Sequence, residues 1–239
     1  MGLRSLHAFN HEYASAFALL KAVFSHRRPR PGMPKVPGYV AHFACREGSW
    51  LAAAKALGVA RVMGIDTSAM RETPLCIEPG EFHDMDLAQI KVVLPQKADL
   101  IICVEYAHQL NPERGAGLVA DLCESADLVL FSAGIPRQDN HPDHNYQWQS
   151  YWAKQFAEHG FLPEWRFRER CWSDKTVAPA YRQNCVLYAR AARMPKKLPD
   201  FERLDLVHPA AWEALQERQR ALALQLTRST IRQLSKWKS

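Results

Sequence analysis

The sequence predicts an α/β protein with a doubly wound, mostly parallel sheet, an antiparallel edge strand and helical extensions at both ends. Short apolar runs alternate with helical patterns between residues 38 and 192, which is typical of a parallel sheet covered by helices on both faces. The last two apolar runs of this region are joined without a clear helix, which permits an antiparallel edge strand. Helical patterns precede and follow the region.

Each element is expected from its local pattern. Residues 1–37 combine a helix, from His11 to Phe24, with a connector rich in proline and arginine. Strands are expected at 39–45, 59–65, 98–104, 128–132, 161–171 and 183–189. Helices are expected at 49–57, 112–125 and 147–159, with Pro112 in a first turn and Gly160 after a last one. We expect residues 38–192 to form the main domain, 193–209 a linker and 210–239 a basic C-terminal helix.

Composition limits the classes of function. The chain has 239 residues, a net charge of +6 and 47% hydrophobic residues, as an ordinary soluble domain does. Because it has neither a signal-peptide pattern nor a long apolar run, we expect a cytoplasmic protein without a transmembrane segment. The six cysteines form no Cys-x-x-Cys pair, so no metal site is predicted. The positive charge comes without a nucleic-acid-binding signature, which makes that kind of partner unlikely.

The segment from Val40 to Asp66 carries most of the functional information. An apolar run stops at a turn with Gly48, a helical pattern follows, and a second apolar run ends in Asp66. This strand–turn–helix–strand unit with a terminal acid is the layout of a dinucleotide or nucleoside site. The turn brings backbone N–H groups near the ligand, and the carboxylate can accept hydrogen bonds from two ribose hydroxyls.

Ordered motifs between residues 38 and 192 resemble the class I S-adenosylmethionine (SAM)-dependent methyltransferases, which have a Rossmann-like fold. Phe43 to Trp50 stand where that family has its glycine-rich first loop, and Gly64–Ile65–Asp66 match the motif whose acid holds the ribose. Asp84 to Leu87 resemble the adenine-binding segment, and Ala98 to His108 the fourth strand and its loop. The resemblance implies SAM as cofactor. It implies these cofactor-binding residues: Ala44, Cys45, Arg46, Gly48, Trp50, Asp66, Thr67, Asp86, Leu87, Glu105 and Tyr106.

The later part, with a long loop after the fifth strand and Tyr181 to Asn184 before the last one, resembles a narrower branch of this family. That branch implies O-methylation of a small hydroxylated molecule, a sugar or a glycan. Within the loop, His141, Asp143 and His144 are candidates for acid–base catalysis, because a neutral imidazole can take a proton near pH 7. Metal ligation and a solvated loop are the other interpretations. His108 is a second candidate base.

One departure from the family motif supports a different class of function. The first loop reads His42-x-Ala44-x-Arg46-x-Gly48 where the family has Asp-x-Gly-x-Gly-x-Gly. A catalytically inactive binding protein on the same fold is therefore the alternative hypothesis. In that case the C-terminal helix would be a surface for a partner or for self-association. An ordinary packed helix is the simpler interpretation, and a partner-binding or membrane-surface helix is the other.

Overall fold

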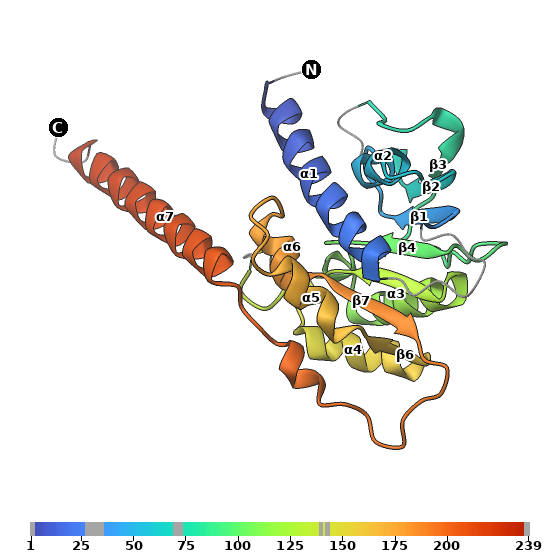
Figure 1. The fold of residues 1–239 in the computed structure, drawn as a ribbon. Helices are drawn as coiled ribbons and strands as arrows, with labels where there is room; N and C mark the ends of the chain where they lie inside the picture. Colours follow the sequence, from blue (N-terminus) through green and yellow to red (C-terminus); the bar gives the residue numbers. More distant parts are fainter. Residues whose placement is uncertain (1–2, 27–35, 69–73, 139–140, 142–143, 237–239) are drawn as a thin grey trace. The chain divides into compact units, whose positions relative to one another are not determined.

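Figure 1 shows the computed structural model of the chain, which describes residues 3–26, 36–68, 74–138, 141 and 144–236. The chain divides into two compact units, Met1–Leu206 and Val207–Ser239. The first unit holds the β-sheet and the helices that cover it. The second contains the long helix α7 (Pro209–Lys236).

The sheet of the first unit has seven strands in the order β3-β2-β1-β4-β5-β7-β6. Strands β1 to β5 run parallel, and β7 is antiparallel to both of its neighbours, β5 and β6. The predicted doubly wound sheet with an antiparallel edge is therefore confirmed. The strands are β1 (Tyr39–Phe43), β2 (Arg61–Asp66), β3 (Phe82–Asp84), β4 (Leu100–Cys103), β5 (Leu128–Phe131), β6 (Phe161–Pro163) and β7 (Val186–Arg190).

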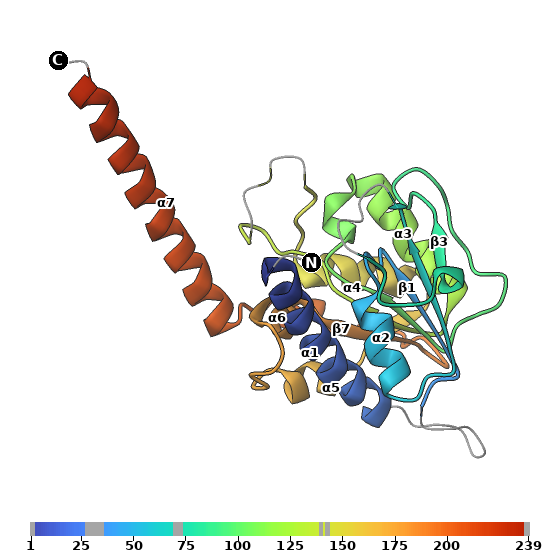
Figure 2. The same cartoon turned by 90° about the horizontal axis from the view of Figure 1, so that it is seen from above.

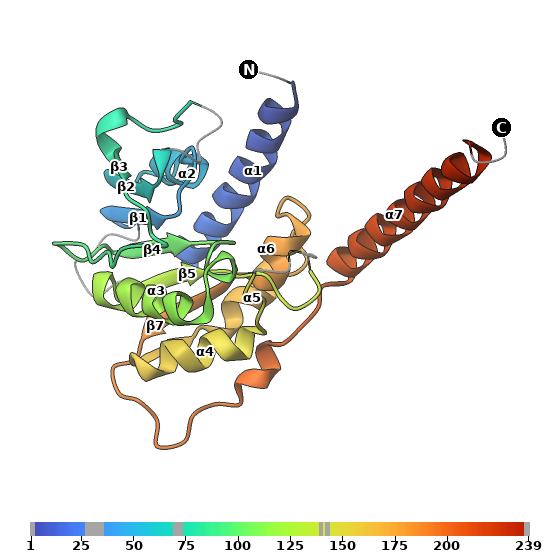
Figure 3. The ribbon, with the colours of Figure 1, turned by 180° about the vertical axis from the view of Figure 1, so that it is seen from behind.

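Helices cover both faces of this sheet. Helices α1 and α2 lie side by side over one face together with α5 and α6, while α3 and α4 cover the other (Figures 2 and 3). The helices of this unit are α1 (Leu3–His26), α2 (Ser49–Ala56), α3 (Pro112–Ser125), α4 (Gln149–Glu158), α5 (Trp165–Cys171) and α6 (Pro179–Asn184). Short 3-10 helices are η2 (Pro79–Glu81), η3 (Ala107–Gln109) and η4 (Phe201–Leu204).

The apolar strands build two cores, one on each face. In β4, Ile101 and Cys103 point into the core under α3 and α4, whereas Leu100 and Ile102 point into the core under α1 and α2. All four side chains are fully buried. A strand that is apolar at every position suits a central place in a sheet covered on both faces.

The region before the last strand differs from the prediction of a strand at 161–171. The strand ends at Pro163, and residues 165–171 form α5. Phe167 and Cys171 are four residues apart and both buried, which is the spacing of one helix face. The strand expected at 183–189 also begins later, at Val186, because α6 ends at Asn184. Two helices thus join the last two strands, where none was expected.

The segment expected to be a linker, residues 193–209, contains η4. Its Phe201 and Leu204 are each 4% exposed and belong to the core under α3 and α4. The backbone amide and hydroxyl of Ser150, in the first turn of α4, donate to the carboxylate of Asp205 at 2.8 and 2.7 Å. Part of this segment is therefore fastened to the first unit.

Candidate active site

The first loop follows β1 at the carboxyl edge of the sheet and leads into α2. The amides of Ala44 and Cys45 both donate to the carbonyl of Ile65 at the end of β2, at 2.8 and 3.2 Å. Ala44 and Gly48 have positive φ angles of 62° and 87°. A Cβ at Gly48 would lie 3.0 Å from Cγ1 of Ile77. Glycine thus suits this turn for two reasons: it adopts the positive φ without strain, and it has no Cβ to collide with Ile77.

Asp66 ends β2 beside this loop, where its side chain is half-buried. Its Oδ2 accepts a hydrogen bond from the amide of Arg46 at 2.7 Å, and its Oδ1 accepts one from the amide of Thr67 at 2.8 Å. Burial raises the pKa of the carboxyl group, while these two amides act in the opposite direction. A carboxylate has about four acceptor positions, so each oxygen keeps a second position for a ligand hydroxyl.

The side chain of Arg46 lies near two acidic residues. It is 71% exposed, and its guanidinium lies 3.9 Å from a carboxylate oxygen of Glu12 in α1 and 3.8 Å from one of Glu47. Arg46 has a positive φ of 51°, and its amide donates to Asp66. Its charge also acts against the burial that raises the pKa of Asp66.

The predicted adenine-binding segment lies in the same neighbourhood. The carboxylate of Asp86 is close enough to raise the pKa of Asp66, and both carboxylates add to the burial that raises the pKa of Tyr106. Asp86 Oδ1 accepts the amide of Ala88 at 2.9 Å, and Leu87 is buried. The structure thus brings together three predicted cofactor residues, Asp66, Asp86 and Tyr106.

Arg114 of α3 holds this segment and was missed by the sequence analysis. Its Nε donates to the carbonyl of Leu87 at 2.7 Å, and its Nη2 donates to the carbonyl of Ile90 at 2.9 Å and to Asp121 at 2.8 Å. Its place just after the helix start gave no sign of this role. The arginine fixes the backbone that carries Asp86 and Leu87.

Trp50 does not join this group. Its indole is fully buried and packs edge-on against the rings of His42 and Tyr181, with centroids 6.1 and 5.3 Å away. Such enclosure suits a core residue that supports the loop from beneath α1. The expected cofactor contact at Trp50 is therefore replaced by packing.

Glu105, after β4, also points elsewhere than expected. Its carboxylate accepts hydrogen bonds from Asn184 of α6 at 3.0 Å and from Gln138, in the loop after β5, at 3.3 Å. Asn184 also donates to Gln138 at 2.8 Å. Burial raises the pKa of Glu105 against the effect of these amides. The carboxylate thus belongs to a network of amide side chains from α6 and the loop after β5. Gln138 and Asn184 are members that the sequence analysis did not single out.

The predicted histidines converge around Tyr146. The ring of His108 is buried and stacks on Tyr146 with centroids 5.2 Å apart, while Nδ1 of His144 lies 3.0 Å from the tyrosine hydroxyl. His141 stacks on His144 at 4.0 Å. A Cβ at Gly134 would lie 2.8 Å from Cε1 of Tyr146, so this glycine makes room for the tyrosine. Asp143, the third member of the predicted catalytic cluster, lies outside the described residues.

Hydrogen bonding assigns different chemistry to two of these histidines. The amide of Gly134 donates to Nδ1 of His108 at 2.9 Å, so a neutral His108 carries its proton on Nε2 and acts as a donor. That tautomer does not suit the predicted role of His108 as a base. When Nδ1–H of His144 donates to Tyr146, the lone pair of His144 is on Nε2, which is the form a base needs.

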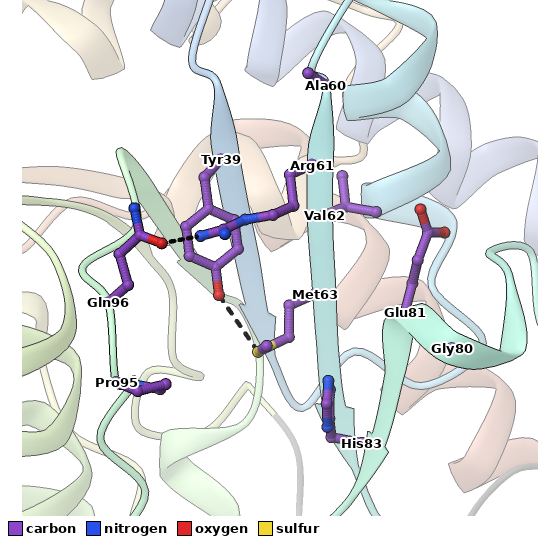
Figure 4. Close-up of a pocket in the computed structure, with 10 residues that line it drawn as sticks. All are labelled: Tyr39, Ala60, Arg61, Val62, Met63, Gly80, Glu81, His83, Pro95 and Gln96. Atoms are coloured by element: carbon purple, nitrogen blue, oxygen red, sulfur yellow. Dashed lines mark hydrogen bonds between the residues drawn. The ribbon is translucent and has the colours of Figure 1, made fainter.

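A cavity of about 350 Å³ lies away from these residues, where β1 and β2 begin (Figure 4). The guanidinium of Arg61 lies 3.6 Å from the centre of the Tyr39 ring and donates to Gln96 at 3.0 Å. The Tyr39 hydroxyl lies 3.4 Å from the sulfur of Met63. The polar groups of these side chains thus already contact one another. In addition, open α/β sheets bind ligands at the opposite, carboxyl edge of the sheet.

The described residues contain no cluster of three or more His, Cys, Asp or Glu side chains that could hold a metal ion. They also contain no helix with the length and apolar character needed to cross a membrane.

The sheet order and the antiparallel β7 match the fold of the class I SAM-dependent methyltransferases. The magnesium protoporphyrin IX methyltransferase of Synechocystis PCC 6803, solved with bound SAM, has this fold at a TM-score of 0.50 and 19% identity, over 79% of this chain and 83% of that one. The SAM-bound amino pentose methyltransferase of Micromonospora echinaspora matches at a TM-score of 0.51 and 12% identity, over 77% and 92%. No protein-family model and no curated protein matches the chain.

Proposed function

We propose that this protein is a SAM-dependent methyltransferase that methylates a hydroxyl group of a small molecule or sugar. The observation that carries the proposal is Asp66, a strand-end carboxylate held by two backbone amides with acceptor positions left over. Two proteins of the same fold were solved with SAM bound. A cytoplasmic location and the absence of a nucleic-acid partner stay predictions.

The described residues fit this cofactor. Asp66 would accept the ribose hydroxyls, the segment at Asp86 and Leu87 would border the adenine, and the loop from Ala44 to Gly48 would face the methionine part. Arg46 contributes its backbone amide to Asp66, and its side chain is 71% exposed. When bound, SAM would supply an electrophilic methyl group at this edge of the sheet.

The acceptor would be handled by the opposite side of the site. His144 is proposed to take the hydroxyl proton as the oxygen is methylated, with Tyr146 orienting its ring. The network of Glu105, Gln138 and Asn184 offers carboxylate and amide groups suited to further hydroxyls. Trp148, with 38% of its surface exposed, offers an apolar face to a sugar ring. Much of the rate enhancement would come from positioning the two reactants.

The alternative is a catalytically inactive protein on the same fold. One observation favours it: His42, in place of the family's first acid, is buried away from the loop beside Trp50. Titration calorimetry of the purified full-length protein with SAM separates the two hypotheses. Saturable heat with one ligand per chain supports the enzyme, and no heat at ligand concentrations on the order of 1 mM contradicts it.

Substitution of the proposed base is expected to slow chemistry without loss of cofactor. His144→Gln should lower kcat by about 100-fold or more, because general-base catalysis contributes about 10²–10⁴-fold. The assay is transfer of labelled methyl groups from SAM to a panel of hydroxylated molecules and sugars, combined with SAM titration. His159→Gln, at an exposed histidine after α4, is the matched control and should keep full activity. Equal rates for His144→Gln and the control would rule out His144 as the base.

A further inference from the structure

Over residues 209–225, where its side chains are described, the long helix α7 of the second unit has one side without charged residues. At about 100° per residue, Trp212, Leu215 and Leu222 fall within one sector of about 120°. Trp212 is 54% exposed and Leu222 is 49% exposed. The other members of the sector in the same part of the helix are uncharged as well: Ala211, Gln219 and Ala223. The helix is therefore amphipathic along a narrow apolar face.

The charge of the helix is strongly uneven along its length. Acidic residues occur only near its start, at Glu213 and Glu217, and the sequence from Arg218 to the end has no acidic residue. Among the helix residues whose side chains are described, the cations of that stretch are Arg218 and Arg220, and both fall outside the uncharged sector at the same angular step. They flank the apolar face on its two sides, and the sequence that follows adds further arginines and lysines without an acidic residue.

We propose that α7 is a membrane-surface helix that binds anionic lipid, lying in the plane of the membrane. Apolar side chains such as Trp212 and Leu222 would enter the boundary of the acyl chains, while Arg218 and Arg220 on the flanks would contact lipid phosphates. This combination of an apolar face containing tryptophan and leucine with a basic face is what such interfacial helices use. Attraction of cations to anionic headgroups adds to it. The inference goes beyond the proposed methyl transfer and does not depend on it.

The distribution of residues favours lipid over two other partners. RNA would be bound by the cations alone and gives no reason for an uncharged sector with exposed Trp212 and Leu222. A second copy of the helix would bring the same cations close together, without acidic residues after Glu217 to pair with them. An anionic membrane satisfies both faces at once.

Matched substitutions on the two sides of the helix test the proposal. Leu222→Glu places a charge in the uncharged sector, and Leu224→Glu places the same charge at a residue that is 60% exposed and lies on the other side. The full-length proteins are sedimented with vesicles of equal parts phosphatidylglycerol and phosphatidylcholine, and with phosphatidylcholine alone. Circular dichroism checks that both variants are folded.

The wild-type protein is expected to bind the anionic vesicles and to bind pure phosphatidylcholine at least tenfold more weakly. Leu222→Glu should lose at least tenfold in vesicle binding, whereas Leu224→Glu should lose less than threefold. The proposal is overturned if the wild type does not bind anionic vesicles or if both variants lose binding equally. Tighter binding to polyuridylate than to vesicles, or loss of a dimer in Leu222→Glu without any effect on vesicles, would overturn it as well.

Discussion

Asp66→Ala is expected to weaken SAM binding at least about 100-fold. The proposed contacts are two hydrogen bonds from ribose hydroxyls to a charged acceptor, each worth about 1.5–3 kcal/mol. Loss of about 3 kcal/mol corresponds to about two orders of magnitude in Kd. The substitution also removes the acceptor for the amides of Arg46 and Thr67, so the first loop would lose its link to β2. Calorimetric titration with SAM measures the change.

Asp99 supplies a closely matched control. Its Oδ2 likewise accepts two backbone amides, from Gly38 at 2.8 Å and Tyr39 at 3.0 Å, but at the opposite end of β1. Asp99→Ala therefore removes the same number of backbone hydrogen bonds at a distance from the proposed ribose site. It should lower stability while SAM affinity changes less than about threefold. Similar losses of affinity in both variants would mean that Asp66 acts only through folding.

The sequence was sufficient to predict the fold and the position of Asp66. Strands that are apolar at every position, such as Leu100–Cys103, indicate a sheet buried on both faces. A short helix or a turn follows each strand in the chain. An acid at the end of the second predicted strand must lie at the carboxyl edge, because parallel strands all end there. Local pattern and chain direction fix this part of the site without knowledge of side-chain packing.

Side-chain direction at the site could not be read from the sequence. Glu105 follows a buried strand just as Asp66 does, yet its carboxylate turns to Asn184 of α6, a residue 79 positions later. The tautomer of His108 depends on one amide, that of Gly134. Both depend on contacts between distant segments, and no local periodicity reports such contacts. α5 was mistaken for a strand for a related reason, since only burial of Phe167 and Cys171 selects the helical face.

His42 gives a second large expected effect, on stability rather than on binding. Its ring is 2% exposed, and neither ring nitrogen has a hydrogen-bond partner among the described residues. Burial lowers its pKa from the usual 6.5 to about 3. The unfolded chain therefore binds a proton at this residue that the folded protein does not bind. Its contribution to stability is complete above about pH 6.5 and is lost as the pH falls toward about 3.

Between pH 7 and pH 4 this one group should lower the free energy of unfolding by about 3 kcal/mol, since one pKa unit corresponds to about 1.36 kcal/mol. His42→Leu removes the titrating ring and keeps an apolar side chain under α1. Between pH 7 and pH 4 the free energy of unfolding of this variant should therefore fall by about 3 kcal/mol less than that of the wild type. Urea denaturation of both proteins at the two pH values measures it. His159→Leu, at an exposed histidine, should follow the wild type. A variant at His42 with an unchanged pH dependence would show that the buried imidazole is protonated in the folded protein, and hence that a negative group or water reaches it beneath Trp50.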